Sequence, residues 1–259
     1  MARKLLFIAN DGGTANHLGG VQYDKRNYLD FFHLPEGGNW QNEEIKIYDN
    51  TATLQQIRSL LITMGANYFD YIVIVFSGHG CTNREGETYF ELSHGHIVSL
   101  SDFKALRNIT VTTRYLMIAD SCRSIPRYQQ GGRLEVHRRL FTESRDNNEY
   151  KERCKQLYDE AFAQQPASCF CIGYATSFGQ DAIDISNRGG LYSQALLLST
   201  KNEIERAKRD QQGDCIISFR EVNQLAKDSV PLQSNGQQVP DYDFTYGAEP
   251  PFCVIPLRN

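Results

Sequence analysis

In the stretch Tyr71-Ile72-Val73-Ile74-Val75-Phe76-Ser77-Gly78-His79-Gly80, an unbroken apolar run is followed at once by small and polar residues. A run of this length, rich in β-branched and aromatic side chains, predicts a strand that is buried on both faces of a sheet. The same pattern returns in Arg114-Tyr115-Leu116-Met117-Ile118-Ala119-Asp120-Ser121-Cys122-Arg123. We therefore expect two buried strands, one leading to a histidine and the other to a cysteine.

These strand ends would place an imidazole and a thiol at one edge of the sheet. Open α/β sheets carry their chemistry in the loops at the carboxyl ends of parallel strands. A free cysteine has a pKa of about 8.5, so its thiol needs a base to become a good nucleophile at neutral pH. His79 and Cys122 would supply both parts. Either motif alone is weak evidence, because small polar residues follow many buried strands, and it is the pair that carries the hypothesis.

The two motifs resemble those of the caspase, metacaspase and paracaspase superfamily of cysteine peptidases. Caspases have a histidine about 50 residues before the catalytic cysteine, and His79 precedes Cys122 at a comparable distance. Asp120-Ser121-Cys122 is similar to the metacaspase motif, whereas Arg123 is similar to the residue that follows the cysteine in caspases and paracaspases. Caspases carry Gln at the position of Asp120. The resemblance spans nearly the whole chain.

Strand and helix patterns alternate along the sequence, which predicts a mainly parallel sheet with helices on both faces. The fold class that we expect, in line with the resemblance, is a caspase-like three-layer α/β/α sandwich with a mostly parallel six-stranded sheet. We predict strands over 4–9, 44–48, 71–76, 114–120, 169–175 and 252–256, and helices over 21–32, 54–61, 101–108, 149–163, 190–205 and 218–230. A surface hairpin is expected over 81–99 and a long loop over 231–251.

The chain is expected to form a single catalytic domain over 1–259. Residues 1–123 would correspond to the large subunit of caspases and 169–259 to the small subunit. The charged segment 124–168 between them lies where caspase-like enzymes carry their intersubunit linker, and cleavage there often accompanies activation. The resemblance therefore implies self-processing, and basic sites in this segment would suit an enzyme that cuts after Arg: Arg133, Arg138, Arg139 and Arg145.

The stretch from Gly173 to Asp184 resembles the specificity loop of caspases. Caspases cut after Asp because arginines and a glutamine line the first pocket. By register, Asp184 stands in place of one arginine, Asp120 in place of the glutamine and Leu18 in place of the arginine of the first loop. A pocket that has lost positive charge and gained carboxylates would hold Arg or Lys and repel an acidic side chain.

Metacaspases carry the same logic, since the residues that match Asp24, Ser77 and Asp120 line their first pocket. For Asp24 the alternative is an ordinary acid near a helix N-terminus, and for Asp184 it is an ordinary loop acid. The resemblance further implies that Cys122 attacks the scissile carbonyl, that His79 acts as the base and acid, and that backbone N–H groups of Cys122 and Gly80 stabilise the oxyanion.

An extended substrate is expected to pair as an added strand beside Ala175 and Thr176. The predicted partner is a protein or peptide with a basic residue before the cut. The final apolar strand, with Phe252 and Val254, would make a sticky exposed edge, so a homodimer through this strand is favoured over a covered monomer.

Composition limits the other partners. The chain has 27 basic and 31 acidic residues and a formal net charge of −4, which gives no reason to expect nucleic acid or a membrane as a partner. Its seven cysteines include no C-x-x-C pair, which indicates free thiols and a cytoplasmic location. Neither a cofactor nor a metal site is expected. Calcium dependence is known among metacaspases, but Glu85, Glu87 and Glu91 are too scattered to support it.

Two other function classes stay open. A Cys-His pair also serves thiol acyltransferases and amidases that act on small molecules. The same fold can also serve as a non-catalytic binding module, although the presence of both His79 and Cys122 argues against it. Replacement of Cys122 by Ala would separate these hypotheses, because self-cleavage in the 124–168 segment should vanish with the thiol.

Overall fold

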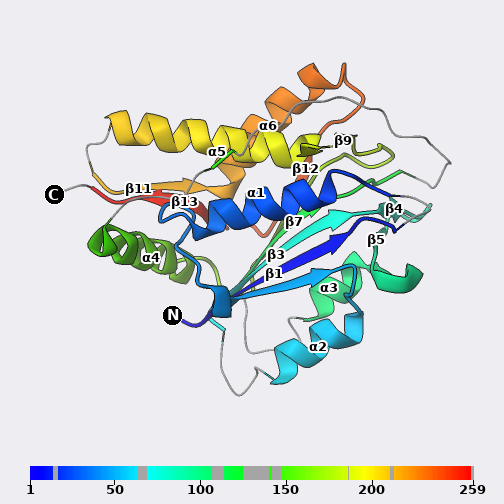
Figure 1. Ribbon diagram of the computed structural model, residues 1–259, viewed down its shortest axis with the longest axis horizontal. Coiled ribbons are helices and arrows are strands. Elements are labelled where there is room, and N and C mark those ends of the chain that lie inside the picture. Colours follow the sequence, from blue (N-terminus) through cyan, green and yellow to red (C-terminus); the bar gives the residue numbers. More distant parts are fainter. Residues whose placement is uncertain are drawn as a thin grey trace.

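A computed structural model gives the structure of the protein and describes residues 1–13, 17–63, 69–106, 114–124, 140–141, 147–185, 187–210 and 213–257. A central six-stranded sheet has helices on both faces, so the predicted α/β/α sandwich is confirmed (Figure 1). The four arginines that we expected as self-processing sites lie outside the described residues. None of the helices in the described part of the chain is both long and apolar enough to cross a membrane.

The sheet has the strand order β12-β8-β7-β3-β1-β2. Five strands are mutually parallel, and β12 alone runs antiparallel, against β8. Every residue of β1, β3, β7 and β8 is buried, as their unbroken apolar runs predict. The strand bounds are β1 Arg3–Asn10, β2 Ile45–Asp49, β3 Tyr71–Gly78, β7 Tyr115–Asp120, β8 Phe170–Tyr174 and β12 Asp241–Phe244.

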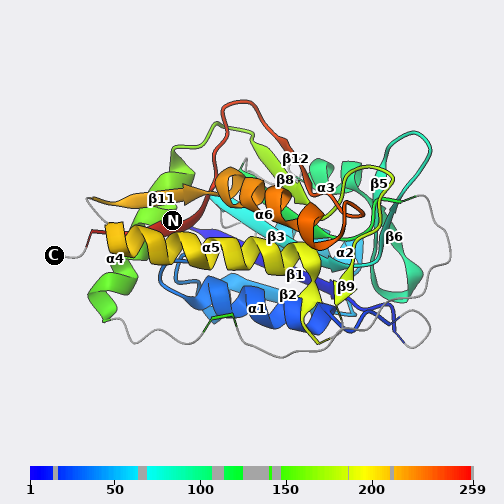
Figure 2. The same cartoon turned by 90° about the horizontal axis from the view of Figure 1, so that it is seen from above.

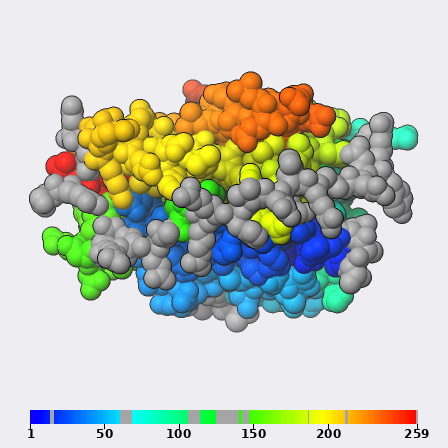
Figure 3. All heavy atoms as spheres, turned by 45° about the horizontal axis from the view of Figure 1, so that its top comes forward, coloured from blue at the N-terminus to red at the C-terminus, as the bar shows by residue number. Residues whose placement is uncertain are grey.

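Among the helices that the structure describes, four cover one face of the sheet and two cover the other. On the first face, α1, α5 and α6 run side by side (Figures 2 and 3), and α4 packs its apolar residues into the same core. On the second face, α2 and α3 close a smaller core. The helix bounds are α1 Val21–His33, α2 Leu54–Thr63, α3 Leu100–Leu106, α4 Asn148–Ala163, α5 Leu191–Asp210 and α6 Phe219–Gln233.

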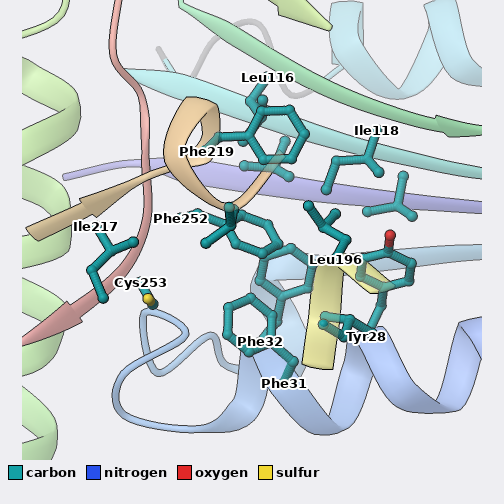
Figure 4. Close-up of a cluster of buried hydrophobic side chains, with 14 of the residues drawn as sticks. Tyr28, Phe31, Phe32, Leu116, Ile118, Leu196, Ile217, Phe219, Phe252 and Cys253 are labelled. Carbon is teal, nitrogen blue, oxygen red and sulfur yellow. The ribbon is translucent and has the colours of Figure 1, made fainter. Parts of the chain in front are cut away.

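Aromatic side chains dominate the larger core. Phe31 of α1 lies against Phe252, with ring centroids 4.8 Å apart, and Phe219 of α6 packs on Phe252 at 5.3 Å (Figure 4). All three side chains are fully buried. Aromatic pairs at these separations add stabilisation beyond that of the buried area alone. The core therefore ties α1 and α6 to the carboxyl-terminal strand.

The sixth strand of the sheet is not the one that we predicted. The final strand, β13 Pro251–Ile255, pairs with β11 Cys215–Ser218 in a separate two-stranded ribbon. The place at the sheet edge is taken by β12, which lies inside the predicted loop 231–251. Phe252 and Val254 are fully buried, so the exposed apolar edge on which we based the homodimer does not exist. The homodimer itself stays a prediction without that support.

Short strands surround the carboxyl end of the sheet. The predicted hairpin over 81–99 is a three-stranded sheet of β4 Gly80–Thr82, β5 Thr88–Glu91 and β6 Ile97–Ser99. After β8, the strands β9 Asp184–Ile185 and β10 Gly189–Gly190 form a small antiparallel pair directly before α5. Two short 3-10 turns, Asn42–Glu44 and Ser93–Gly95, complete the described elements.

Candidate active site

The register between β3 and β7 brings the histidine and cysteine motifs to one edge of the sheet. Ser77 pairs with Asp120, so His79 and Cys122 each lie two residues beyond a paired position. The segments that follow β3 and β7 also lie in contact, because a Cβ built at Gly80 would lie 2.7 Å from Ser121 Oγ and 2.9 Å from the Cys122 carbonyl oxygen. Only glycine therefore allows this approach of the two loops.

The thiol of Cys122 is partly buried under the loop that joins β8 to β9. Its Sγ accepts a hydrogen bond from Ala182 N–H at 3.2 Å, and it donates to the Ala182 carbonyl oxygen at 3.8 Å. Burial, the largest cause, and the Asp181 carboxylate together raise the pKa of Cys122 to about 11 against the lowering effect of the Ala182 N–H. In this conformation the sulfur is therefore a thiol at neutral pH.

Asp24 and Ser77 meet beside these strand ends. Ser77 Oγ donates to Asp24 Oδ2 at 2.7 Å, and the Gly190 N–H donates to Asp24 Oδ1 at 2.9 Å. Both carboxylate oxygens of Asp24 are thus engaged. The side chain is almost fully buried although it lies in the first turn of α1.

Asp120 and Asp184 complete a group of three carboxylates that we call the acid cluster. Asp120 Oδ2 accepts two hydrogen bonds from Ser193, from the backbone N–H at 3.0 Å and from Oγ at 2.6 Å. Asp184 Oδ2 accepts from the Gly20 N–H at 3.1 Å. Asp120 Oδ1 accepts no hydrogen bond from the described residues, which leaves it available to a ligand.

Burial and mutual repulsion disfavour ionisation of the acid cluster. Burial raises the pKa of Asp24 well above its ordinary range and Asp120 raises it further, while burial followed by the charge of Asp184 raises the pKa of Asp120 to about 6. Burial also raises the pKa of Asp184, against the smaller lowering effect of neighbours that include the His79 imidazole. No Lys or Arg of the described residues forms an ion pair with any of the three, so the cluster suits a cationic ligand.

Two glycines form a wall against the acid cluster. A Cβ at Gly190 would overlap the carboxylate of Asp120, and one at Gly189, whose φ is +108°, would overlap Asp24. Backbone and carboxylate approach this closely only because neither residue has a side chain. The Gly-Gly pair before α5 was visible in the sequence, but it does not by itself say which side chains approach it.

The structure places Ala175 and Thr176 directly after β8. Ala175 N–H donates to the Ala119 carbonyl oxygen and Ala175 O accepts from Gln238 Nε2, both at 2.9 Å. Thr176 O accepts from Arg123 Nη1 at 3.2 Å. Pairing of a substrate strand at these residues stays a prediction, and at Ala175 it would require one of these bonds to be shared or broken.

Several residues of the site were missed in the sequence. Ser193 holds Asp120, and Asp181 and Ala182 contact Cys122 or lie beside it. Gln238 bonds both ends of the loop after β8. These contacts join residues far apart in the chain, and no local pattern marks them. Within the part of the chain that the structure describes, no group of three or more His, Cys, Asp or Glu side chains could hold a metal ion.

Comparison with known proteins supports the resemblance. The model of a protein family described as the caspase domain matches residues 2–247. Among solved structures, the fold is similar to the crystal structure of protein GSU0716 from Geobacter sulfurreducens, with a TM-score of 0.56 and 15% sequence identity. That match covers 98% of this chain and 100% of the other, and it speaks for the fold alone. No curated protein matches the sequence.

Proposed function

The chain belongs to the caspase domain family of peptidases, and on this premise we propose that it is a cysteine endopeptidase that cleaves polypeptides after Arg or Lys. The observation that carries the basic specificity is the acid cluster at the edge of the sheet where β3 and β7 end. The other site roles follow from the family, applied to the residues at that edge.

Specificity would come from charge in a largely desolvated pocket. Asp120 Oδ1 is the acceptor best placed to meet a guanidinium, because Asp24 uses both of its oxygens within the protein. A cation that enters the pocket relieves the mutual repulsion of the carboxylates, whereas an acidic side chain adds to it. Lys would bind as a point charge and Arg as a planar fork that can make two hydrogen bonds.

In the proposed reaction, His79 takes the proton of the Cys122 thiol as the sulfur attacks the scissile carbonyl carbon. A C–S bond forms and the carbonyl oxygen becomes an oxyanion, which backbone N–H groups of Gly80 and Cys122 would stabilise. The C–N bond then breaks, and the imidazolium gives its proton to the leaving amine. Water, deprotonated by His79, attacks the thioester and releases the acid and the free thiol. Because the pKa of Cys122 is about 11 in this conformation, a base is needed for the first step.

Self-processing and a cytoplasmic location belong to the same proposal. All seven cysteines are free thiols, which suits a reducing compartment. Metacaspase-like self-cleavage would fall in the 124–168 segment, where it would be visible as two fragments of defined mass. One observation favours the alternative of a non-catalytic module, namely that Ala182 already occupies both hydrogen-bonding capacities of the Cys122 sulfur.

Fluorogenic peptides that end in Arg, Lys or Asp, assayed beside intact mass spectrometry, test the proposed function. We expect turnover of the Arg and Lys peptides and none of the Asp peptide, and we expect the Cys122→Ala variant to lose both peptide cleavage and any fragments of the chain. Faster turnover of the Asp peptide would overturn the specificity. If Cys122→Ala were as active as the wild type, or if the wild type cleaved none of the peptides, the assignment as a cysteine peptidase would be wrong.

A further inference from the structure

The loop over 175–184 connects β8 to β9 and carries two parts of the site. Its Ala182 peptide contacts the sulfur of Cys122, and its last residue is Asp184 of the acid cluster. Ile183 lies between them, so a shift of its backbone would move the contact with the nucleophile and the pocket carboxylate together.

Gln238, from the segment between α6 and β12, bonds both ends of this loop. Its side-chain oxygen accepts from the Ile183 N–H at 2.9 Å, and its Nε2 donates to the Ala175 carbonyl oxygen at 2.9 Å. The side chain is fully buried, so water cannot replace either bond. A single carboxamide thus closes the base of the loop with one donor and one acceptor.

The backbone of Gln238 is held in place by its own segment. Ser234 Oγ accepts from the Gln238 N–H at 3.1 Å and donates to the Gln238 carbonyl oxygen at 3.2 Å. The next residue also bonds the loop, since Val239 N–H donates to Gln180 Oε1 at 2.9 Å and Val239 O accepts from Ser177 Oγ at 3.0 Å. The loop is therefore fastened along its length to residues 238 and 239.

We propose that Gln238 is a positioning residue that holds Ala182 against Cys122 and Asp184 in the acid cluster, and so sets the distance between the nucleophile and the pocket for the basic side chain. This inference rests on the proposed function for its effect on peptide cleavage. Its effect on the thiol does not, because the Cys122 sulfur contacts the loop directly. The two effects can be measured separately.

Gln238→Glu offers a test that a merely structural role would not pass. A protonated carboxyl donates and accepts like the carboxamide, whereas an ionised one has no donor for the Ala175 carbonyl oxygen. A buried carboxyl without a cation partner keeps its proton to a higher pH than an exposed one. The charged groups on the loop and on the segment that holds it are Asp181, Asp184 and Asp241, and Asp241 is paired with Arg123. These groups also titrate in the wild type. Each rate is therefore divided by the wild-type rate at the same pH, which cancels their contribution.

For cleavage of an Arg peptide, we expect the kcat/KM of Gln238→Glu relative to the wild type to be near one at pH 5.5 and to fall at least tenfold by pH 8.5. Gln238→Ala should lose at least tenfold at every pH. Gln237→Glu and Gln237→Ala are matched controls, because Gln237 is the exposed neighbour, and their ratios should stay near one. A flat ratio for Gln238→Glu, or equal behaviour of the two alanine variants, would overturn the proposal.

The rate at which iodoacetamide alkylates Cys122, followed by peptide mass mapping, gives the second readout. Burial, the largest cause, and Asp181 together raise the pKa of this thiol by more than the Ala182 N–H lowers it. Release of the loop weakens all three effects, so the pKa should fall and alkylation should become faster. The Gln238→Glu rate relative to the wild type should rise at least threefold between pH 6.5 and 8.5, and the Gln237→Glu ratio should stay constant. An unchanged ratio would overturn the inference even if peptides are cleaved. If the alkylation ratio changed but the protein cleaved no peptide, the proposed function would be wrong and the role of Gln238 in positioning the loop would still be supported.

Discussion

Asp120 joins two tasks in one side chain. Its Oδ2 accepts both hydrogen bonds from Ser193, whereas its Oδ1 accepts none from the described residues. The first oxygen fixes the orientation of the carboxylate, and under the proposed function the second would meet the basic side chain of the substrate. Under the proposed function, the charge state of this one residue controls how well a basic substrate binds.

Asp120→Asn should raise the KM for Arg peptides by about 10- to 100-fold, because a hydrogen bond to a charged group contributes about 1.5–3 kcal/mol and 1.4 kcal/mol corresponds to about tenfold in binding. The pKa of Asp120 is raised to about 6, mainly by burial, so the wild-type carboxylate gains its proton as the pH falls through this value. The wild-type KM should therefore rise below pH 6, and that rise should be absent from the variant.

Asp228→Asn is the control, since Asp228 is an exposed acid on α6 that bonds only to Gln224 nearby. Its KM should follow the wild type at every pH. Steady-state kinetics between pH 5 and 8 decide the matter. If Asp120→Asn kept the wild-type KM, the pocket would have to be sought elsewhere.

Asp181 acts on the thiol of Cys122. Burial is the main cause of the raised pKa of Cys122, and the Asp181 carboxylate, which accepts a hydrogen bond from Ser124 Oγ, adds to it. Asp181→Asn removes the negative charge, so the pKa of the thiol should fall and more thiolate should be present at pH 8. We expect alkylation of Cys122 by iodoacetamide to become severalfold faster, as measured by mass mapping. Asp210→Asn at the exposed end of α5 should leave the rate unchanged, and an equal effect of both variants would refute this account.

At the scale of elements, the N-terminus of α5 and the acid cluster stabilise each other. The first N–H groups of a helix have no partner within the helix, and its dipole favours negative charge there. Asp120 of β7 accepts from the Ser193 N–H in the first turn, and Asp24 of α1 accepts from the Gly190 N–H just before the helix. Three elements thus meet at the acid cluster, and the N-terminal end of α5 provides hydrogen-bond donors for carboxylates whose burial is otherwise unfavourable.

Ser193→Ala should shift the pH profile of the enzyme toward higher pH. The Ser193 side chain lowers the pKa of Asp120 by bonding to its charged form, so its loss should raise that pKa. The pH below which the KM for Arg peptides climbs should then move upward, with the KM at pH 8 changed little. Ser199→Ala, on the same helix but only partly buried, should keep the wild-type profile. A profile that did not move would show that Ser193 has no part in tuning Asp120.

The sequence predicted those helices and strands that a short stretch of residues specifies by itself. The buried runs predicted β1, β3, β7 and β8. The helix predicted over 218–230 begins as expected, at a capping box that Ser218 and Glu221 form in the structure. The strands β11 and β12 were missed because each has only four residues and forms by pairing with a distant partner. Pairing of this kind is a tertiary choice that overrides weak local propensity.

The candidate site divides in the same way. Asp120 was foreseeable because its distance from Cys122 is fixed by two residues of chain, and Ser77 and His79 share a strand end. Ser193 and Gln238 were not foreseeable, since each acts through a bond between its side chain and a backbone or carboxylate far away in the sequence. Polar residues of this sort have no periodicity, and many similar ones in the chain lie on the surface.

At the scale of the whole molecule, the site is assembled from both sides of the 124–168 segment. Asp24, Ser77 and Cys122 precede it, whereas Ala182, Asp184 and Gly190 follow it, and hydrogen bonds join the two groups directly. The acid cluster is therefore held together only by the fold as a whole. It also costs stability, because three carboxylates whose pKa values are raised oppose folding at neutral pH.

Asp24→Asn should therefore stabilise the fold and weaken the cleavage of Arg peptides. The amide can accept from Gly190 N–H and donate to Ser77 Oγ, so both bonds survive. Burial and then Asp120 raise the pKa of Asp24 in the folded protein well above its ordinary value of 3.8. Asp24 therefore ionises more readily in the unfolded chain than in the folded one, and the protein loses stability as the pH rises above 3.8. The variant should unfold later than the wild type at pH 8, by about 0.5–2 kcal/mol, and the gain should shrink as the pH falls toward 4. Cleavage of Arg peptides should drop at least tenfold.

Asp49→Asn is the control of opposite sign. Burial alone would raise the pKa of Asp49, but hydrogen bonds from Lys25 and Gln22 together lower it, so its contribution to stability is present at neutral pH and is lost in acid. This variant should unfold earlier than the wild type at pH 8, with peptide cleavage retained. Thermal unfolding followed by circular dichroism at pH 4, 6 and 8 compares the three chains. If Asp24→Asn were less stable than the wild type at pH 8, the buried carboxylate would stabilise the fold. The view that Asp24 lowers stability in order to bind a cation would then be wrong.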